Sequence, residues 1–244
     1  MNSSRAVLKV DLHIHTSDDP KDRIPYSTRD AIDHARRLGY HAISITLHDR
    51  QLELELFANY AAARGIVLIP GIERTIEGRH VLLLNFPGDM VLKVRSFDDL
   101  ARLKRQCNGL VVAPHPFFPG PNSLFRFLDR HAELFDAVEY NAMYTTSLNF
   151  NRRAEEWARA HGRPLVGNGD VHRLVQLGTT YSLVDAAPDP ASICAAVAAG
   201  RVRVETSPLP WSMALRTFAD IVVPFLGIKP PPVAAVPAGD SLAA

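Results

Sequence analysis

Short runs of β-forming residues alternate with helical patterns along most of this chain, and this alternation constrains the fold more than any other feature. The first run covers residues 7–15, a helical pattern follows over residues 27–38, and a second apolar run covers residues 42–46. Ser27 is a typical N-cap residue, and Gly39 follows directly after the predicted helix. Repeated strand–helix units of this kind predict an α/β fold with parallel strands.

The same pattern continues toward the end of the sequence. Further strands are predicted over residues 66–69, 80–86, 110–113, 137–140, 165–166 and 202–205, and further helices over residues 52–63, 96–107, 149–161 and 189–199. The chain has 244 residues, of which 47% are hydrophobic, so it is long enough to bury a sizeable core in one domain.

Charge and cysteine content narrow the class of protein. A net charge of +1 argues against a dominant surface for nucleic acid or membrane. Cys107 and Cys194 fall in predicted helices, and two cysteines do not indicate a disulfide framework. The sequence starts without the apolar core of a signal peptide, and no apolar run is long enough to span a bilayer. These features predict a cytoplasmic protein without a membrane partner.

Residue types that bind metal ions follow the ends of most predicted strands. They are His13, His15, His48, Glu73, His115, Asn141, Asp170 and His172. Side chains alternate along a strand, so the two histidines of the first strand point to the same side. In a closed barrel all carboxyl ends of the strands meet on one face, whereas an open sheet spreads them along an edge. This recurrence therefore favours a barrel with a single metal site.

The ordered motifs resemble those of the PHP-domain family, the polymerase and histidinol phosphatase family. The matching segments are DLHIHT at residues 11–16, ITLHD at 45–49, PGIE at 70–73, APHPF at 113–117, VEYN at 138–141 and GDVH at 169–172. The resemblance implies a distorted (βα)7 TIM-like barrel of the PHP type, which we expect over residues 1–210.

The resemblance also implies a centre of two or three divalent metal ions. Each expected ligand is a residue that matches a family motif or lies in the loop after His15: His13, His15, Asp19, His48, Glu73, His115, Asp170 and His172. Glu73 is expected to bridge two ions. Three aspartates of that loop compete for one position, and Asp19 is preferred. Mixed imidazole and carboxylate ligands suit Zn²⁺, Mn²⁺ or Fe²⁺ better than Ca²⁺.

One position departs from the family pattern. Many relatives have Thr-Asp-His in the second motif, whereas this chain has Thr46-Leu47-His48. Any ligand or proton role of that aspartate is therefore missing. Asp49, on the other side of His48, is a candidate to replace it.

The resemblance implies a metal-dependent phosphoesterase that hydrolyses a small phosphorylated metabolite or nucleotide through a metal-bound hydroxide. The expected catalytic residues are Glu73, Asp170 and His48. The expected substrate-binding residues are His80, Asn141, Arg74 and Arg173. Two alternatives stay open: a related hydrolase that cleaves a C–N or C–O bond, and a non-catalytic module whose metal site is degraded at Leu47.

The last residues form a separate region. Residues 211–228 have an amphipathic pattern and predict a C-terminal helix that docks on the barrel or on another copy. Residues 229–244 are rich in Pro and Ala and predict a disordered tail. The expected partner is a small phosphorylated substrate, with no stable nucleic-acid partner. The sequence leaves open whether copies of the chain associate.

Overall fold

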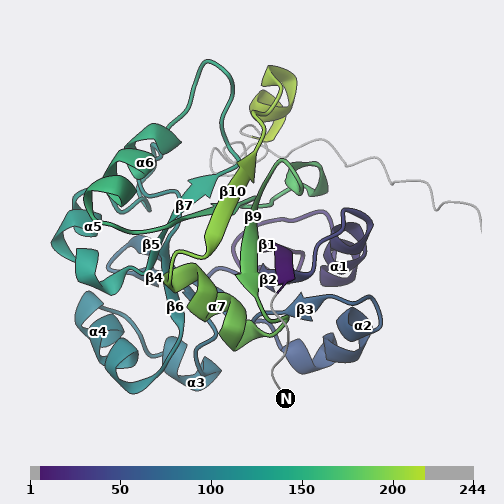
Figure 1. Ribbon diagram of the computed structural model, residues 1–244, viewed down its shortest axis with the longest axis horizontal. Helices are drawn as coiled ribbons and strands as arrows, with labels where there is room; N and C mark the ends of the chain where they lie inside the picture. Colours follow the sequence, from purple (N-terminus) through teal and green to yellow (C-terminus); the bar gives the residue numbers. More distant parts are fainter. Residues whose placement is uncertain (1–5, 218–244) are drawn as a thin grey trace, which may run out of the picture.

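The computed structural model describes residues 6–217, which form two five-stranded sheets with helices around them (Figure 1). The strands are β1 (Ala6–Ile14), β2 (Ala42–Ile45), β3 (Val67–Leu68), β4 (Gly71–Ile76), β5 (Arg79–Leu84), β6 (Leu110–Ala113), β7 (Ala137–Asn141), β8 (Leu165–Asn168), β9 (Thr180–Ala186) and β10 (Val202–Thr206). The α-helices are α1 (Thr28–Arg37), α2 (Ala58–Ala62), α3 (Gly88–Val91), α4 (Phe97–Gln106), α5 (Arg126–Arg130), α6 (Asn151–Ala160) and α7 (Pro190–Ala198). Short 3₁₀ turns cover Leu54–Leu56, Ala132–Leu134 and Leu174–Gln176.

Each sheet combines parallel and antiparallel pairs. The first sheet has the order β10-β9-β1-β2-β3, in which β1, β2 and β3 are parallel and β9 runs antiparallel to both its neighbours. The second has the order β4-β5-β6-β7-β8, in which β5 is antiparallel to its neighbours and β6, β7 and β8 are parallel. Helices α1 and α2 lie beside the first sheet, and α3 to α6 lie around the second (Figure 1).

The predicted α/β class is confirmed, but the expected closed barrel is not seen among the described strands. Their hydrogen bonds form two sheets instead of one ring. One reason is the tight turn at Glu77 and Gly78, which both have positive φ and fold β5 back onto β4. The chain is also interrupted between the two-residue strand β3 and β4, because Ile69 and Pro70 belong to neither strand. Isolated parallel bridges join the sheets instead, between His48 and Glu73 and between Ile14 and Val171.

The space between the sheets is filled by apolar side chains from both of them. One buried cluster contains Val10 and Leu12 of β1 together with Leu82 of β5, Val112 of β6 and Ile193 of α7. Fully burying an aliphatic side chain of this size contributes about 1.5–3 kcal/mol. This shared core fixes the two sheets against each other, and therefore fixes the polar residues at their strand ends.

Helix boundaries follow the capping signals of the sequence. Ser27 caps α1 and accepts a hydrogen bond from the Asp30 backbone, and the Asp30 side chain accepts one from the Ser27 backbone. Ser96 and Asp99 form the same capping box at α4. The helix predicted over residues 52–63 is shorter than expected, because a 3₁₀ turn precedes the five-residue helix α2.

The C-terminal prediction is only partly covered by the described residues. Residues 211–217 are helical, whereas residues 218–228 of the predicted helix and the whole predicted tail lie outside the described part. Within residues 6–217, every helix is too short or too polar to cross a bilayer.

Candidate metal centre

The predicted ligands come together because the backbone ties their strands at the carboxyl ends. The backbone amide of His15 donates to the Val171 carbonyl (3.1 Å), and the Val171 amide donates to the His13 carbonyl (3.2 Å). The Glu73 amide donates to the Leu47 carbonyl (3.2 Å). These bonds place the end of β1 beside Asp170 and the end of β2 beside Glu73.

Two of the ligand positions have an uncommon backbone conformation. His115 has φ 30° and Asp170 has φ 45°, in the left-handed region that L residues with side chains rarely adopt. Such residues persist only where the surrounding contacts hold them. The backbone amide of His115 is held by the carboxylate of Glu139, at 2.7 Å. This strain is typical of a functional site.

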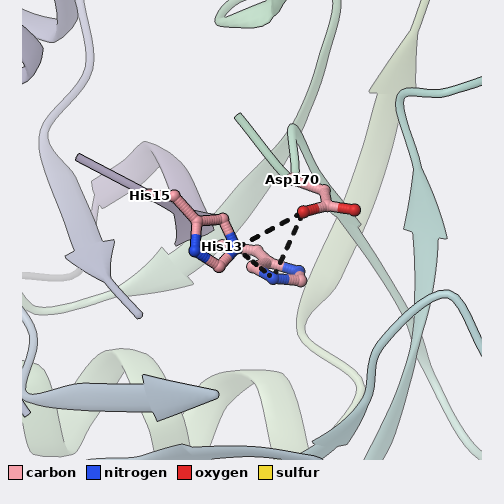
Figure 2. Close-up of side chains that lie close together, drawn as sticks. All are labelled: His13, His15 and Asp170. Atoms are coloured by element: carbon pink, nitrogen blue, oxygen red, sulfur yellow. Dashed lines mark hydrogen bonds and ion pairs between the residues drawn. The ribbon is translucent and has the colours of Figure 1, made fainter. Parts of the chain in front are cut away.

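Three donor side chains meet at the end of β1 and the loop after β8 (Figure 2). The Nε2 atoms of His13 and His15 are 3.2 Å apart, and they lie 3.4 and 3.5 Å from Asp170 Oδ1. Both histidines are fully buried. Donor atoms bound to one ion at about 2.0–2.1 Å would be separated by similar distances.

Glu73 lies at the centre of the cluster and faces five histidines. Its Oε2 atom is 3.4 Å from the Nε2 atoms of His13 and His15 and 3.1 Å from that of His48. Its Oε1 atom is 3.1 Å from His115 Nε2 and 2.7 Å from His80 Nδ1. Burial would raise the pKa of Glu73, but the histidine charges, led by His80 and His13, hold that pKa well below its ordinary value.

The donor set fits transition-metal ions. Three overlapping groups could each hold an ion: His13 with His15 and Asp170, His13 with Glu73 and His115, and His15 with His48 and Glu73. Among the described residues, Glu73 Oε2 and His80 Nδ1 are buried, and the contacts they make lack the geometry of a hydrogen bond, which is costly unless a cation compensates. Imidazole nitrogens with carboxylate oxygens are the ligands of Zn²⁺, Mn²⁺ and Fe²⁺.

Two buried carboxylates lie within hydrogen-bond distance of the Nδ1 atoms of three histidines. Glu139 Oε1 is 2.8 Å from His13 Nδ1. Asp19 Oδ2 is 3.0 Å from His15 Nδ1 and 2.9 Å from His48 Nδ1. Asp19 therefore contacts the Nδ1 atoms of His15 and His48. It is absent from the three donor groups that the described residues form. Burial would raise the pKa of Asp19, but hydrogen bonds from His15 and His48 lower it strongly.

His172 lies at the edge of the cluster with an acidic partner. Its Nε2 atom is 3.0 Å from Asp22 Oδ2, and its ring centroid is 4.6 Å from that of His15. Burial would lower the pKa of His172, but the Asp22 carboxylate outweighs it and raises the pKa to about 9. Asp22 is thus the aspartate of the loop after His15 that reaches His172.

The predicted substrate-binding residues lie in different surroundings. Asn141 donates through Nδ2 to Asp170 Oδ2 and to Glu139 Oε2, both at 3.0 Å, so it is within the centre. Arg74 donates instead to Asp49 Oδ1 (2.7 Å) and to the Val94 carbonyl (2.8 Å). Arg173 follows His172 directly and is half-buried.

Leu47, the residue that departs from the family motif, is part of the core. Leu47 is fully buried in the apolar cluster that packs against α1. Asp49 binds Arg74, Lys21 and Thr75, so its carboxylate is engaged away from the histidines. These contacts give Asp49 a structural role in the turn after β2.

Glu139 is the site residue that the sequence reasoning left without a role. A signal for it is present, because an acidic residue in a fully buried parallel strand is rare unless it is paired. All five residues of β7 are buried, and Glu139 is at its centre.

Comparisons with known proteins find one partial match to a family model and several similar folds. A model of the PHP-associated family matches residues 149–202. No curated protein sequence matches the chain.

Several solved structures share the fold at low sequence identity. A two-domain protein from Bacteroides vulgatus, described as containing a predicted PHP-like metal-dependent phosphoesterase, is 20% identical with a TM-score of 0.65, over 88% of this chain and 69% of that protein. PsfC from Pseudomonas syringae is 16% identical with a TM-score of 0.62, over 91% of this chain and 99% of PsfC. The lesion-specific endonuclease PfuEndoQ from Pyrococcus furiosus is 15% identical with a TM-score of 0.56, over 82% of this chain and 58% of the endonuclease.

The matched segment contains Asp170 and His172 of the candidate metal centre, and the solved structures share the overall fold. The His, Glu and Asp side chains form three groups that could hold divalent metal ions.

Proposed function

We propose that this protein is a metal-dependent phosphoesterase that hydrolyses a small phosphorylated metabolite or nucleotide. The observation that carries the proposal is the position of Glu73, one buried carboxylate shared by five histidines. Because Glu73 belongs to two of the three donor groups, we propose that it bridges two ions. Zinc, manganese or iron ions bound there would polarise the phosphoryl group and lower the pKa of a water.

The side chains of this protein would orient the ligands and the substrate. Asn141 donates to Asp170 Oδ2 and leaves Oδ1 directed at His13 and His15. His80 lies against Glu73 from the hairpin strand β5, where it could contact an ion or a phosphate oxygen. His172 and Asp22 form the proposed position of a third ion.

The two predicted arginines take different parts in this proposal. Arg173 directly follows His172, so it is our candidate for a bidentate contact to phosphate. The guanidinium of Arg74 is already engaged by Asp49 and by backbone carbonyls, so we assign it to the support of the turn after β2.

A small substrate fits this chain better than nucleic acid. PfuEndoQ is a lesion-specific endonuclease, but this chain spans only 58% of it. The net charge of +1 offers no excess of cations for a phosphate backbone. The free cysteines Cys107 and Cys194 suit the reducing cytoplasm, which is the proposed location.

A phosphate-release screen tests the proposal. The purified chain, loaded in turn with Mn²⁺, Zn²⁺ and Fe²⁺, is incubated with mononucleotides, nucleoside bisphosphates and sugar phosphates. We expect release of inorganic phosphate that Glu73→Ala abolishes and that the exposed control Glu133→Ala leaves unchanged. If all esters stay intact while Glu73→Ala changes the turnover of an amide or a lactone, the hydrolase acts on a C–N or C–O bond. If the chain binds no metal, the non-catalytic alternative is favoured.

A further inference from the structure

Glu139 accepts hydrogen bonds from four donors and is fully buried. Its Oε1 atom is 2.8 Å from His13 Nδ1 and 3.0 Å from Asn168 Nδ2. Its Oε2 atom is 2.7 Å from the His115 backbone nitrogen and 3.0 Å from Asn141 Nδ2. This one carboxylate therefore connects β1, β7, β8 and the loop after β6.

The two asparagines must present their NH₂ groups to Glu139. The side-chain oxygen of Asn168 accepts from the Leu12 amide (3.0 Å), and that of Asn141 accepts from the Met143 amide (2.8 Å). Backbone amides can only donate, so the orientation of both side-chain amides is fixed. Three of the four partners of Glu139, namely the two side-chain amides and the His115 backbone amide, can therefore only donate, as suits an ionised carboxylate.

The same argument fixes the tautomer of His13. A carboxylate can only accept, so His13 carries a proton on Nδ1. In the neutral ring the lone pair is then on Nε2, the atom that faces Glu73 and Asp170. Glu139 thus sets the ligand nitrogen of His13 and, through the backbone amide, the position of His115.

Asp19 is the corresponding group for the other two histidines. Its Oδ2 atom is 3.0 Å from His15 Nδ1 and 2.9 Å from both Nδ1 and the backbone nitrogen of His48. Its Oδ1 atom accepts from the backbone amides of Lys21 (2.8 Å) and Asp22 (3.0 Å). Both oxygens are therefore committed to N–H donors.

We infer that Glu139 and Asp19 divide the ligand histidines between them, so that each is a positioning residue for a different ion. Glu139 orients the histidines of the group His13, Glu73 and His115, whereas Asp19 orients those of the group His15, His48 and Glu73. This inference rests on the metal centre of the proposed function, and it gives Asp19 a role other than the predicted ligand. The third group takes one histidine from each set, so it depends on both.

Amide variants test this division without changing side-chain size. In Glu139→Gln one end of the side chain becomes an NH₂ group that faces two donors. His13 can accommodate it by moving its proton to Nε2, which removes the lone pair from the centre. Asp19→Asn does the same for His15 and His48. Loss of such a supporting carboxylate typically costs about 10- to 100-fold in metal affinity.

The measurement is a Zn²⁺ titration of the full chain, monitored through the ¹⁵N signals of His115 and His48. Each of these two histidines belongs to one donor group only. We expect Glu139→Gln to move the His115 transition to about 10- to 100-fold higher Zn²⁺ with little change at His48. Asp19→Asn should do the reverse. The controls are Asp18→Asn, whose side chain contacts only the hydroxyls of Thr16 and Thr28 among the described residues, and the exposed Glu133→Gln. If both transitions shift together, or neither shifts, the inference is overturned.

The tautomers of the metal-free wild-type protein test the same inference if a variant fails to fold. Long-range ¹H–¹⁵N spectra should show the proton on Nδ1 of His13, His15 and His48, and a proton on Nε2 of neutral His13 overturns the inference. A wild-type chain that binds Zn²⁺ as described but hydrolyses no phosphoester refutes the proposed function and leaves this inference standing.

Discussion

Replacing Leu47 by aspartate, the residue of many PHP-domain proteins at the matching motif position, should destabilise this protein without adding a ligand. Leu47 is fully buried among the apolar residues Ile43, Ile45 and Leu52. Removing a buried leucine side chain costs about 2–5 kcal/mol. Burying a polar group without a partner adds about 1–3 kcal/mol. We therefore expect Leu47→Asp to lower the free energy of unfolding by about 3–8 kcal/mol, a large part of the 5–15 kcal/mol typical of a domain.

Thermal unfolding of the metal-free chain, followed by circular dichroism, measures this effect. A change of 1 kcal/mol shifts the melting temperature of a chain this size by about 2–4 °C, so the expected decrease is about 6–30 °C. Leu47→Met keeps the volume and the apolar character, and its cost should be below about 1.5 kcal/mol. Leu47→Ala should fall between the two.

One outcome would refute the reasoning. If Leu47→Asp keeps the wild-type melting temperature and binds an additional ion, position 47 faces the metal centre, and the missing aspartate is a lost ligand. An equal destabilisation by Leu47→Met and Leu47→Asp would also contradict it, because packing and polarity would then not be the cause.

Three further predictions follow from the site. Arg74→Ala should destabilise the turn that holds Asp49 by about 1–3 kcal/mol in urea unfolding, with unchanged metal content; loss of metal with unchanged stability would argue for a role in the site. In the metal-free protein the pKa of His172 is raised to about 9 by Asp22, above its unfolded value of about 6.5, so this pair stabilises the fold fully below about pH 6.5. That contribution should be lost as the pH rises from about 6.5 to about 9, and His172→Ala should flatten the unfolding free energy over this range; an unchanged slope counts against the pair. Saturation with Zn²⁺ at about 100 times its dissociation constant should stabilise the chain by about 2.7 kcal/mol per ion in thermal unfolding, and Glu73→Gln should remove most of that gain.

Much of the candidate site could be predicted from the sequence because it depends on local patterns. His13 and His15 share a strand face by simple alternation, and His48, Glu73, His115 and Asp170 each follow or end a short apolar run. The structure brings these six residues together in overlapping donor groups. The backbone bridges between neighbouring strand ends are the physical reason.

The arrangement of the strands was harder to predict, because it depends on pairing between distant residues. Strand β9 was missed, although more and less buried residues alternate along it. Its sequence TYSLVDA lies between a loop and a helix, so no directly adjacent strand indicates a pairing. It pairs antiparallel with β1, which precedes it by more than 160 residues. The hairpin of β4 and β5 likewise replaces an expected strand–helix unit and separates the two sheets.

The roles of Asp19 and Glu139 also depend on distant contacts. Asp19 meets His48, which lies 29 residues along the chain, and Glu139 meets His13, at a separation of 126 residues. A sequence pattern shows that such carboxylates are available but not which nitrogen each one faces. The sequence therefore predicted Asp19 as a ligand, whereas the structure places its carboxylate against the Nδ1 atoms of His15 and His48.

The metal content of the purified chain tests the central claim most directly. After dialysis against Mn²⁺ or Zn²⁺ and removal of free metal, mass spectrometry of the elements should find two or three ions per wild-type chain. Glu73→Ala, which removes the shared carboxylate, should bind at least one ion fewer than the wild-type chain. A wild-type chain without bound transition metal, or a Glu73→Ala variant with the wild-type content, would contradict the account.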